Sequence, residues 1–448
     1  MFAPSHVPSP CWARPGAALE GRVRAPGDKS ISHRALIFGL LAIGETRIAN
    51  LLEADDVLRT AEAARALGAR VTREADGRWR VVGAGIGGLR EPADTLDFGN
   101  AGTGSRLMMG VAGSHPITTC FDGDASLRGR PMRRILDPLV RMGTVVVQEA
   151  PGGRVPLTLR GPHETIPVTY ETPAPSAQIK SAVLIAGLNS PGVTTVIERE
   201  ATRDHTERML RHFGAEVAVD AEGAFGRRIM LRGQPTLRGT EVVVPADPSS
   251  AAFALVAAIL VPGSAVVIER VMTNPLRSGL LTTLREMGAA IVIENEDDVG
   301  GETVADLRVS HGPLRGVEVP AERAPTMIDE YPILAVAAAF ADGPTVMRGL
   351  GELRVKESDR LAAVQAGLRA NGVRAEITGD DLTVEGQGRA VAGGGTVATH
   401  LDHRLAMAFL VMGLAARDGV GVDDSTMIAT SFPSFVPLMR ELGATIGG

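Results

Sequence analysis

Cysteine and aromatic residues are scarce in this chain of 448 residues. The two cysteines, Cys11 and Cys120, exclude a disulfide framework and a cysteine-rich metal site, and they are typical of a protein of the reducing cytoplasm. Aromatic residues make up 3% of the chain, so the core must be aliphatic. With a net charge of −6, this scarcity also argues against a nucleic-acid reader, which combines basic patches with stacking rings.

Long apolar runs are also missing. The longest, AAFALVAAILVPGSAVVI, is broken by Pro262 and Gly263 and is too short to span a bilayer. The first twenty residues, MFAPSHVPSPCWARPGAALE, contain no basic region followed by an apolar stretch, so they predict no secretory signal. We therefore expect a cytoplasmic protein without a membrane partner.

Lysine is the scarcest charged residue type. Lys29, Lys180 and Lys356 are the 3 lysines, against 43 arginines. Arginine can replace lysine at most solvated positions, but not where a compact ammonium that can release a proton is needed. Lys29, within PGDKSISHR at residues 26–34, is therefore a candidate functional residue.

What the chain does have is an internal repeat. Six segments, ALGARV, RMGTVV, HFGAEV, EMGAAI, ANGVRA and ELGATI, share a glycine, and these glycines are 71 to 84 residues apart. Each segment predicts a helix closed by a glycine in the left-handed conformation, followed by a strand. The six glycines are Gly68, Gly143, Gly214, Gly288, Gly372 and Gly443.

Each repeat also contains a helix that is apolar nearly all round, which predicts burial on every side. We therefore expect six α/β units of about 75 residues, three in each of two domains, since long chains divide into domains of about 100 to 200 residues. The first domain covers residues 26–244, and residues 245–448 form the second, with a linker around Pro245. An open solenoid with a binding face is the alternative interpretation of such a repeat.

The openings of the apolar helices are polar: PGDKSISHR, FGNAGTGSR, APSAQIK, PADPSSA, TMIDEY and THLDHR. Helix N-termini present free N–H groups and favour anions, so several openings in one domain predict a binding site for anionic ligands. Each opening has a plainer explanation: Ser30 as a helix N-cap, and Asp329 and Glu330 as acids that stabilise a helix dipole. The histidines show no spacing that suggests a metal site.

Eight motifs together resemble the 5-enolpyruvylshikimate-3-phosphate synthase family: PGDKSISHRAL, GNAGTGSR, GDASLRGRPM, SAQIKSA, ATRDHTERML, IDEYPILAVAAA, LRVKESDR and LDHRLAM. They extend over almost the whole chain, and SAQIKSA and SFPSF resemble the bacterial branch that includes glyphosate-tolerant members. The resemblance implies an α/β fold, a two-domain inside-out α/β barrel with three βαβαββ repeats per domain. It also implies that residues 1–25 join the C-terminal domain and that the substrates bind in a cleft between the domains.

The resemblance further implies transfer of the enolpyruvyl group of phosphoenolpyruvate to the 5-hydroxyl of shikimate 3-phosphate, with release of phosphate, in chorismate and aromatic amino-acid biosynthesis. No cofactor and no metal are implied, and we expect a monomer. The implied catalytic residues are Lys29, Asp329 and Glu357. The implied ligands of shikimate 3-phosphate are Lys29, Ser30, Arg34, Ser176, Ala177, Gln178, Arg203, Asp329 and Lys356. Those of phosphoenolpyruvate are Lys29, Gly102, Arg130, Gln178, Arg360 and Arg404.

Two departures from the family pattern bear on phosphoenolpyruvate. Many members have a lysine in the segment that here reads Ala429, Thr430, Ser431, Phe432, so that contact is absent or replaced. Gly102 stands where tolerant relatives carry alanine, which leaves room for the inhibitor glyphosate. Lys180 lies beside Gln178, and the sequence gives it no role.

Two other functions remain open at this point. One is enolpyruvyl transfer to UDP-N-acetylglucosamine, although GDASLRGRPM lacks the reactive cysteine typical of that sister enzyme. The other is a non-catalytic repeat scaffold that binds phosphorylated ligands.

Overall fold

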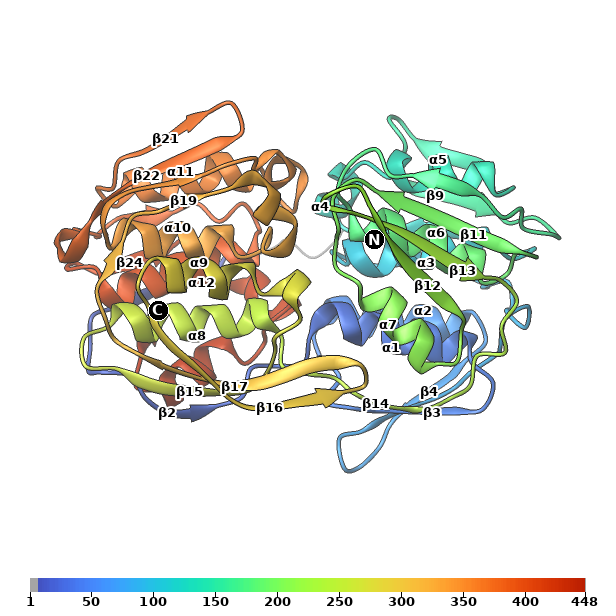
Figure 1. Cartoon of the computed structure of the whole chain (residues 1–448), viewed down its shortest axis with the longest axis horizontal. Coiled ribbons are helices and arrows are strands. Elements are labelled where there is room, and N and C mark those ends of the chain that lie inside the picture. Colours follow the sequence, from blue (N-terminus) through green and yellow to red (C-terminus); the bar gives the residue numbers. More distant parts are fainter. Residues whose placement is uncertain (1–6, 448) are drawn as a thin grey trace. The chain divides into compact units, whose positions relative to one another are not determined.

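A computed structural model describes residues 7–447 of the chain (Figure 1). By their internal contacts these residues form two compact units. Unit 1 comprises residues up to Pro26, Ala246–Asp297 and Thr303–Gly448, and unit 2 comprises Gly27–Pro245 and Asp298–Glu302. Each unit contains three repeats of one α/β arrangement.

Unit 2 contains three four-stranded sheets. The first has the order β14 (Glu241–Val243), β3 (Glu45–Ala49), β5 (Trp79–Val82), β4 (Arg70–Arg73), with α1 (Lys29–Leu41) and α2 (Asp55–Ala66). The second has the order β6 (Leu96–Asp97), β7 (Thr118–Asp122), β9 (Arg154–Arg160), β8 (Val145–Ala150), with α3 (Gly102–Gly113), α4 (Ala125–Gly129) and α5 (Arg133–Arg141). The third has the order β10 (Thr169–Glu171), β11 (Val193–Glu198), β13 (Gly226–Arg232), β12 (Val217–Glu222), with α6 (Ala177–Gly187) and α7 (His205–His212).

Unit 1 repeats the plan. Its first sheet has the order β16 (Ala290–Val299), β17 (Glu302–Ser310), β15 (Ala265–Met272), β2 (Glu20–Val23), with α8 (Pro248–Leu260) and α9 (Gly279–Glu286). The second has the order β18 (Leu314–Arg315), β20 (Ala341–Met347), β22 (Asp381–Gln387), β21 (Ala375–Thr378), with β19 (Glu318–Val319) on β20, and α10 (Tyr331–Ala339) and α11 (Arg360–Ala370). The third has the order β23 (Thr396–Val397), β24 (Val420–Val422), β1 (Cys11–Arg14), β25 (Thr445–Gly447), with α12 (His403–Ala415) and α13 (Phe435–Glu441). Short 3₁₀ turns are η1 (Pro275–Arg277), η2 (Ala321–Thr326), η3 (Gly351–Val355), η4 (Gly388–Ala390) and η5 (Thr426–Thr430).

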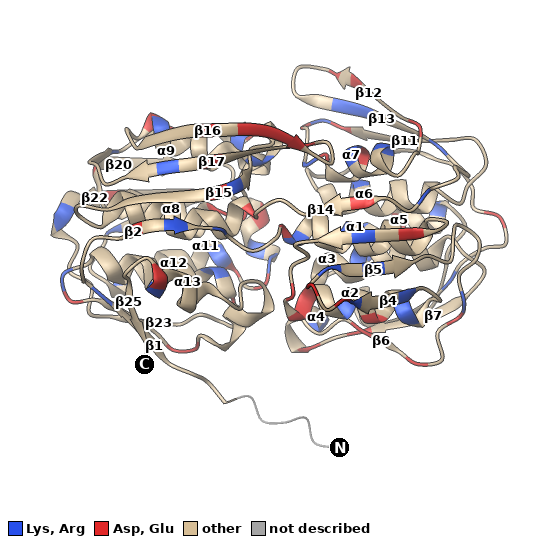
Figure 2. Cartoon of the chain, turned by 90° about the horizontal axis from the view of Figure 1, so that it is seen from below, with Lys and Arg blue, Asp and Glu red and all other residues tan. Residues whose placement is uncertain are grey.

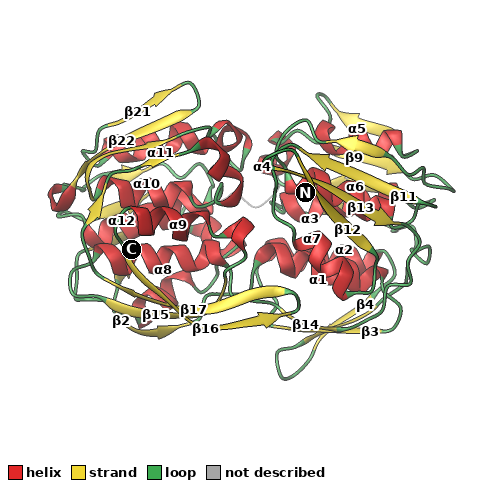
Figure 3. Cartoon of the chain, in the orientation of Figure 1, coloured by secondary structure: helices red, strands yellow, loops and turns green. Residues whose placement is uncertain are grey.

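One helix of each repeat is buried on every side. In unit 2 these helices are α1, α3 and α6, and in unit 1 they are α8, α10 and α12; almost every residue after the first turn of each is buried. Figure 3 shows strands around the helices of each unit. A helix covered on all sides can meet polar ligands only at its ends, which places the polar openings of the repeats at the tips of these six helices.

The strand after each buried helix pairs in parallel with an edge strand of its sheet. In the first sheet of each unit this edge strand comes from a distant part of the chain: β14 beside β3, and β2 beside β15. Strand β1 lies between β24 and β25 and is antiparallel to both. The N-terminal strands are therefore part of the sheets of unit 1. None of the helices within residues 7–447 combines the length and the apolarity that crossing a bilayer requires.

The six repeat glycines all have positive φ angles, between 80° and 113°. In each case the residue after the glycine donates its N–H to a carbonyl five residues back, as in Ala69 to Ala64 and Ala444 to Met439, which closes the helix. The sequence-based prediction of these helix ends is confirmed.

An arginine three residues before the glycine extends this closure in five of the repeats. Its guanidinium donates to the backbone carbonyl six residues further on, in the following strand segment. The five arginines are Arg65, Arg211, Arg285, Arg369 and Arg440, with distances of 2.8 to 3.3 Å. In the second repeat Arg141 comes one residue later, and it lies over the ring of Tyr170 instead.

The turn between β16 and β17 differs from the expected division of the chain. The sequence analysis assigned residues 245–448 as a whole to the C-terminal domain, whereas Asp298–Glu302 group with unit 2. The reason is local: Glu302 pairs with His205 of α7, and Arg208 donates to the carbonyl of Gly301 at 2.6 Å. Figure 2 shows the acidic end of β16 that leads into this turn.

Candidate active site

Unit 2 brings the sequence-predicted residues of its three openings into one connected set. Lys29, Ser30 and Arg34 lie in the first turns of α1, Gly102 begins α3, and Ala177 and Gln178 begin α6 after the N-terminal residue Ser176. Arg130 follows α4, and Arg203 lies in the loop before α7. Contacts between α1, α3, α6 and α7 join these segments.

The opening of α1 is capped by Asp28, not by Ser30. The N–H of Ile31 donates to Asp28 Oδ1 at 2.7 Å, so the N-cap interpretation of Ser30 is wrong. The ammonium of Lys29 contacts Asp56 Oδ2 at 2.8 Å. Arg34 is buried and donates to Thr206 and Ser181, both at 2.8 Å, and to the carbonyl of Ser30. The side chain of Ser30 is therefore not needed to cap the N-terminus of α1.

A second group of contacts joins α3 to α6. The amide of Gln178 donates to Thr103 Oγ1 at 3.0 Å and its carbonyl accepts from Arg106. Arg130 is nearly buried and donates to the carbonyl and side chain of Asn100 in the loop before α3. These contacts fix the guanidinium groups of Arg106 and Arg130 beside the N-termini of α3 and α6.

The electrostatics of this set favour an anionic ligand. Burial lowers the pKa of Arg34 to about 10, the carboxylates of Glu207 and Asp28 act in the opposite direction, and the charge of Arg203 makes a smaller contribution to the lowering. Burial also holds the pKa of His33 well below its ordinary value, together with the charges of Lys29 and Arg34. An anion bound here would offset the cost of gathering these cations.

Unit 1 presents a different set at the N-termini of α10, α11 and α12. Its centre is Arg360, which is fully buried and contacts three carboxylates: Asp402 at 2.7 Å, Asp329 at 3.2 Å and Glu357 at 2.5 Å. Burial acts to lower the pKa of Arg360, but the carboxylates, Asp402 first, raise it above its usual value. Asp329 and Glu357 are thus held on one guanidinium.

Arg404 and Lys356 flank this centre. Arg404 lies in the first turn of α12, and its backbone N–H donates a hydrogen bond to Asp402 Oδ1. Its side-chain Nη1 is 3.4 Å from the carbonyl oxygen of Asp329. Burial lowers the pKa of Lys356, and the carboxylates of Asp329 and Glu352 offset this only in part. A lysine with a lowered pKa can release a proton more readily than an arginine could.

Glu330 has a different place from its neighbour Asp329. It is buried, and it contacts Arg277 and Ser249 at the opening of α8. The sequence analysis gave no role to Asp56 and Asp402, which hold Lys29 and Arg360. Asp56 is in the first turn of α2 and has the pattern of an ordinary helix-dipole acid, whereas Asp402 lies within the motif LDHR.

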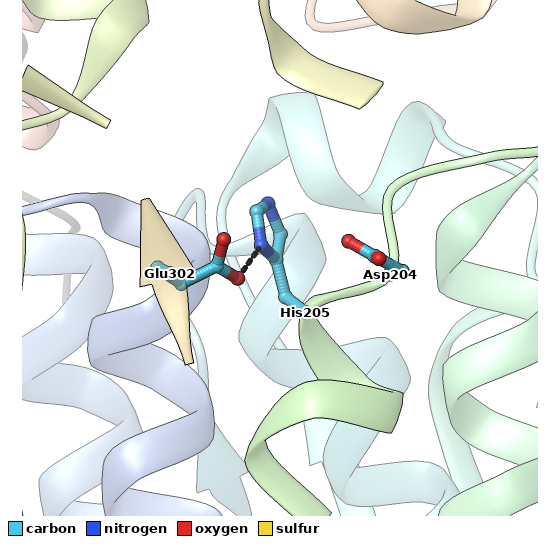
Figure 4. A group of neighbouring side chains, drawn as sticks. All are labelled: Asp204, His205 and Glu302. Atoms are coloured by element: carbon cyan, nitrogen blue, oxygen red, sulfur yellow. Dashed lines mark hydrogen bonds and ion pairs between the residues drawn. The ribbon is translucent and has the colours of Figure 1, made fainter. Parts of the chain in front are cut away.

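Asp204, His205 and Glu302 form a further cluster in unit 2 (Figure 4). His205 Nδ1 lies 2.8 Å from Glu302 Oε1, and the Asp204 carboxylate accepts from Arg208 Nε at 2.8 Å. Arg208 already supplies a positive charge to Asp204. The cluster is therefore explained as a set of contacts that hold residues 298–302 against α7.

Comparisons with known proteins agree with this arrangement. Residues 13–439 match the family model of EPSP synthase (3-phosphoshikimate 1-carboxyvinyltransferase). A Methylobacterium radiotolerans protein named 3-phosphoshikimate 1-carboxyvinyltransferase is 73% identical over 98% of both chains, and a Rhodopseudomonas palustris protein of that name is 65% identical over 98% of both. An EPSP synthase structure from Acinetobacter baumannii has a TM-score of 0.85 and 40% identity, covering 98% of this chain and all of that one.

A more distant structure shows the fold alone. The enolpyruvyl transferase NikO from Streptomyces tendae has a TM-score of 0.72 at 20% identity, over 98% of this chain and 99% of its own. The chain thus shares its α/β fold with an EPSP synthase and with this more distant enolpyruvyl transferase. The chain belongs to the EPSP synthase family. The expectations of this family, of its fold and of a transferase enzyme are confirmed.

The low pKa of His33 predicts a loss of stability in acid. Below pH 6.5 the unfolded chain protonates this histidine while the folded chain does not, so the free energy of unfolding falls as the pH falls. The slope from one such group is at most about 1.4 kcal/mol per pH unit. His33→Gln should make the free energy of unfolding, measured with urea, depend less steeply on pH between pH 7.5 and 5.

The control is His163→Gln, at an exposed position in the same unit. Because burial also lowers the pKa of His115, part of the acid sensitivity should remain in the His33 variant. The prediction would be contradicted if the free energy of unfolding changed equally steeply with pH in His33→Gln and in the unmodified chain.

Proposed function

We propose that the polar sets described above carry out the reaction of the family: transfer of the enolpyruvyl group of phosphoenolpyruvate to the 5-hydroxyl of shikimate 3-phosphate, with release of phosphate. The observation that carries the proposal is that four cationic side chains lie in or beside the N-terminal turns of α1 and α3, two buried helices of unit 2 that are in contact. Both substrates are polyanions, and planar guanidinium groups suit their carboxylates and phosphates. These side chains are Lys29, Arg34, Arg106 and Arg130.

The two substrates divide the polar groups between them. Shikimate 3-phosphate is bound by Lys29, Ser30, Arg34, Ser176, Ala177, Gln178, Arg203, Asp329 and Lys356. Phosphoenolpyruvate is bound by Lys29, Gly102, Arg130, Gln178, Arg360 and Arg404. The proposal thus requires both units to supply groups to the same pair of substrates, and it assigns Lys29 and Gln178 to both.

The carboxylates of unit 1 carry the proton transfers. Asp329 accepts the proton of the attacking 5-hydroxyl, and Glu357 takes part in proton transfer to the methylene carbon of phosphoenolpyruvate. Their common contact with Arg360 supports these roles, because one buried guanidinium fixes the spacing of the two carboxylates. When the phosphoenolpyruvate carboxylate binds Arg360, it competes with these contacts and makes a carboxylate available for proton transfer.

We further propose that the chain acts as a cytoplasmic monomer without a metal ion or an organic cofactor. The free thiols of Cys11 and Cys120 support a reducing compartment.

Phosphate release from the purified chain tests the reaction directly. Shikimate 3-phosphate with phosphoenolpyruvate should give turnover, and UDP-N-acetylglucosamine in place of shikimate 3-phosphate should give none. Turnover with the nucleotide sugar would favour the sister enzyme. A folded chain without turnover on either acceptor would favour a phospholigand-binding scaffold.

Lys29→Arg tests the need for a compact ammonium. The substitution keeps the charge beside Asp56 but brings a wider planar group into a space shared by two substrates. We expect an unchanged circular-dichroism spectrum and a loss of kcat/KM of about a hundredfold, as for reacting groups misplaced by about 1 Å. Arg47→Lys, at an exposed position of β3, should keep full activity. Equal activities of the two variants would contradict the role of Lys29.

Gly102→Ala tests the phosphoenolpyruvate assignment. A Cβ at this position would lie 2.6 Å from Arg130 Nη1, so the guanidinium must move. We expect the KM of phosphoenolpyruvate and the inhibition constant of glyphosate, a competitor of phosphoenolpyruvate, to rise at least about tenfold, equal to about 1.4 kcal/mol. The matched control is Gly129→Ala, next to Arg130, where a Cβ meets no atom within 4 Å. An unchanged inhibition constant in Gly102→Ala would refute the assignment.

A further inference from the structure

Lys180 is one of the 3 lysines of the chain, and its side chain is 1% exposed. Its ammonium contacts three acceptors: Glu198 Oε2 at 2.9 Å, Glu207 Oε1 at 2.9 Å and the carbonyl of Thr202 at 3.2 Å. Burial acts to lower the pKa of Lys180, but the carboxylates of Glu207 and Glu198 raise it above its usual value. The buried group is therefore a charged ammonium with an acceptor for each of its three protons.

This geometry explains why arginine does not replace lysine here. The three protons of an ammonium diverge from one nitrogen, whereas the donors of a guanidinium lie in one plane and extend further from the backbone. An arginine at this fully buried position would overpack the site and leave at least one of the three acceptors without its donor.

The three acceptors are the anchor points of one loop. Glu198 ends strand β11, Glu207 lies in the first turn of α7, and Thr202 lies between them in the loop Arg199–Asp204. Glu198 also accepts from the backbone N–H and the hydroxyl of Thr202. Lys180 therefore holds both ends and the middle of the loop that carries Arg203.

The residues next to these contacts hold Arg34. Ser181 follows Lys180 on α6 and Thr206 precedes Glu207 on α7; both accept from Arg34 at 2.8 Å, and their hydroxyls are 2.7 Å apart. The contact between Lys180 and Glu207 thus fixes the two helices between which the guanidinium of Arg34 is bound. The charge of Arg203 contributes to the lowered pKa of Arg34.

We propose that Lys180 is a positioning residue for shikimate 3-phosphate: it binds neither substrate but places Arg203, and through the α6–α7 contact Arg34, where the substrate anion binds. The inference rests on the assignment of these two arginines as ligands in the proposed function.

The test is the dissociation constant of shikimate 3-phosphate, measured by calorimetry on the full chain without phosphoenolpyruvate. Lys180→Met and Lys180→Arg should each raise it about tenfold, while kcat at saturating substrates changes less than about threefold, because no reacting group is removed. Leu184→Ala is the matched control: it lies one turn further along α6, is fully buried and lowers stability by leaving a cavity. This control should leave the dissociation constant within about twofold.

A double-substitution cycle shows whether Lys180 acts through Arg203. If it does, Lys180→Met should weaken binding by less than about threefold in an Arg203→Gln background, because coupled residues are not additive. Undiminished weakening in that background, or an equal effect of Leu184→Ala, would overturn the inference. If Lys180→Met does not fold, the inference is tested with Lys180→Arg and Glu198→Gln, and both should weaken binding of shikimate 3-phosphate.

Different results would refute the ligand role of Arg203 and the positioning role of Lys180. Arg203→Gln with unchanged binding would refute the ligand role of Arg203, and the inference with it. Weakened binding in Arg203→Gln together with unchanged binding in the folded Lys180 variants would refute the inference alone.

Discussion

The burial of one apolar helix on every side in each repeat is the constraint on which the rest of this structure depends. Such a helix satisfies its backbone internally, except for the N–H groups of its first turn, which need acceptors, and the carbonyls of its last turn, which need donors. Polar side chains can stand only at its ends, since elsewhere they would be buried without partners. Three such helices in contact within a unit bring their polar ends together. In unit 2 cationic side chains therefore lie together where the buried helices begin, an arrangement that suits an anionic ligand.

The closure of the repeats accounts for five of the arginines. In five repeats an arginine guanidinium donates to the backbone carbonyl six residues later in the chain, a contact that suits a long side chain with several planar donors. The three lysines occupy positions of another kind. Lys29 and Lys180 are set against carboxylates at short range, and burial lowers the pKa of Lys356. For Lys180 the three acceptors require the divergent protons of an ammonium.

Local patterns in the sequence predicted what local physics determines. Segments that are apolar nearly all round predicted the buried helices, and the repeat glycines predicted the helix ends, because left-handed backbone favours glycine at that point. The partners of the site residues could not be predicted in this way. Asp56 pairs with Lys29, and Lys180 meets Glu198 and Glu207, through contacts that depend on how separate elements pack. The fastening of residues 298–302 to α7 has the same origin and no local signal.

The two units differ in how their charges are balanced, and this difference suits two different tasks. In unit 2 burial depresses the pKa of Arg34, and the carboxylates of Glu207 and Asp28 offset this only in part, so a bound anion would add to the compensation of a buried cation. In unit 1 three carboxylates already compensate Arg360 and raise its pKa. A ligand anion there must displace an existing contact. Under the proposed function, the first arrangement serves to bind the substrate anions, and the contacts of Asp329 and Glu357 with Arg360 allow these carboxylates to exchange partners as charge moves.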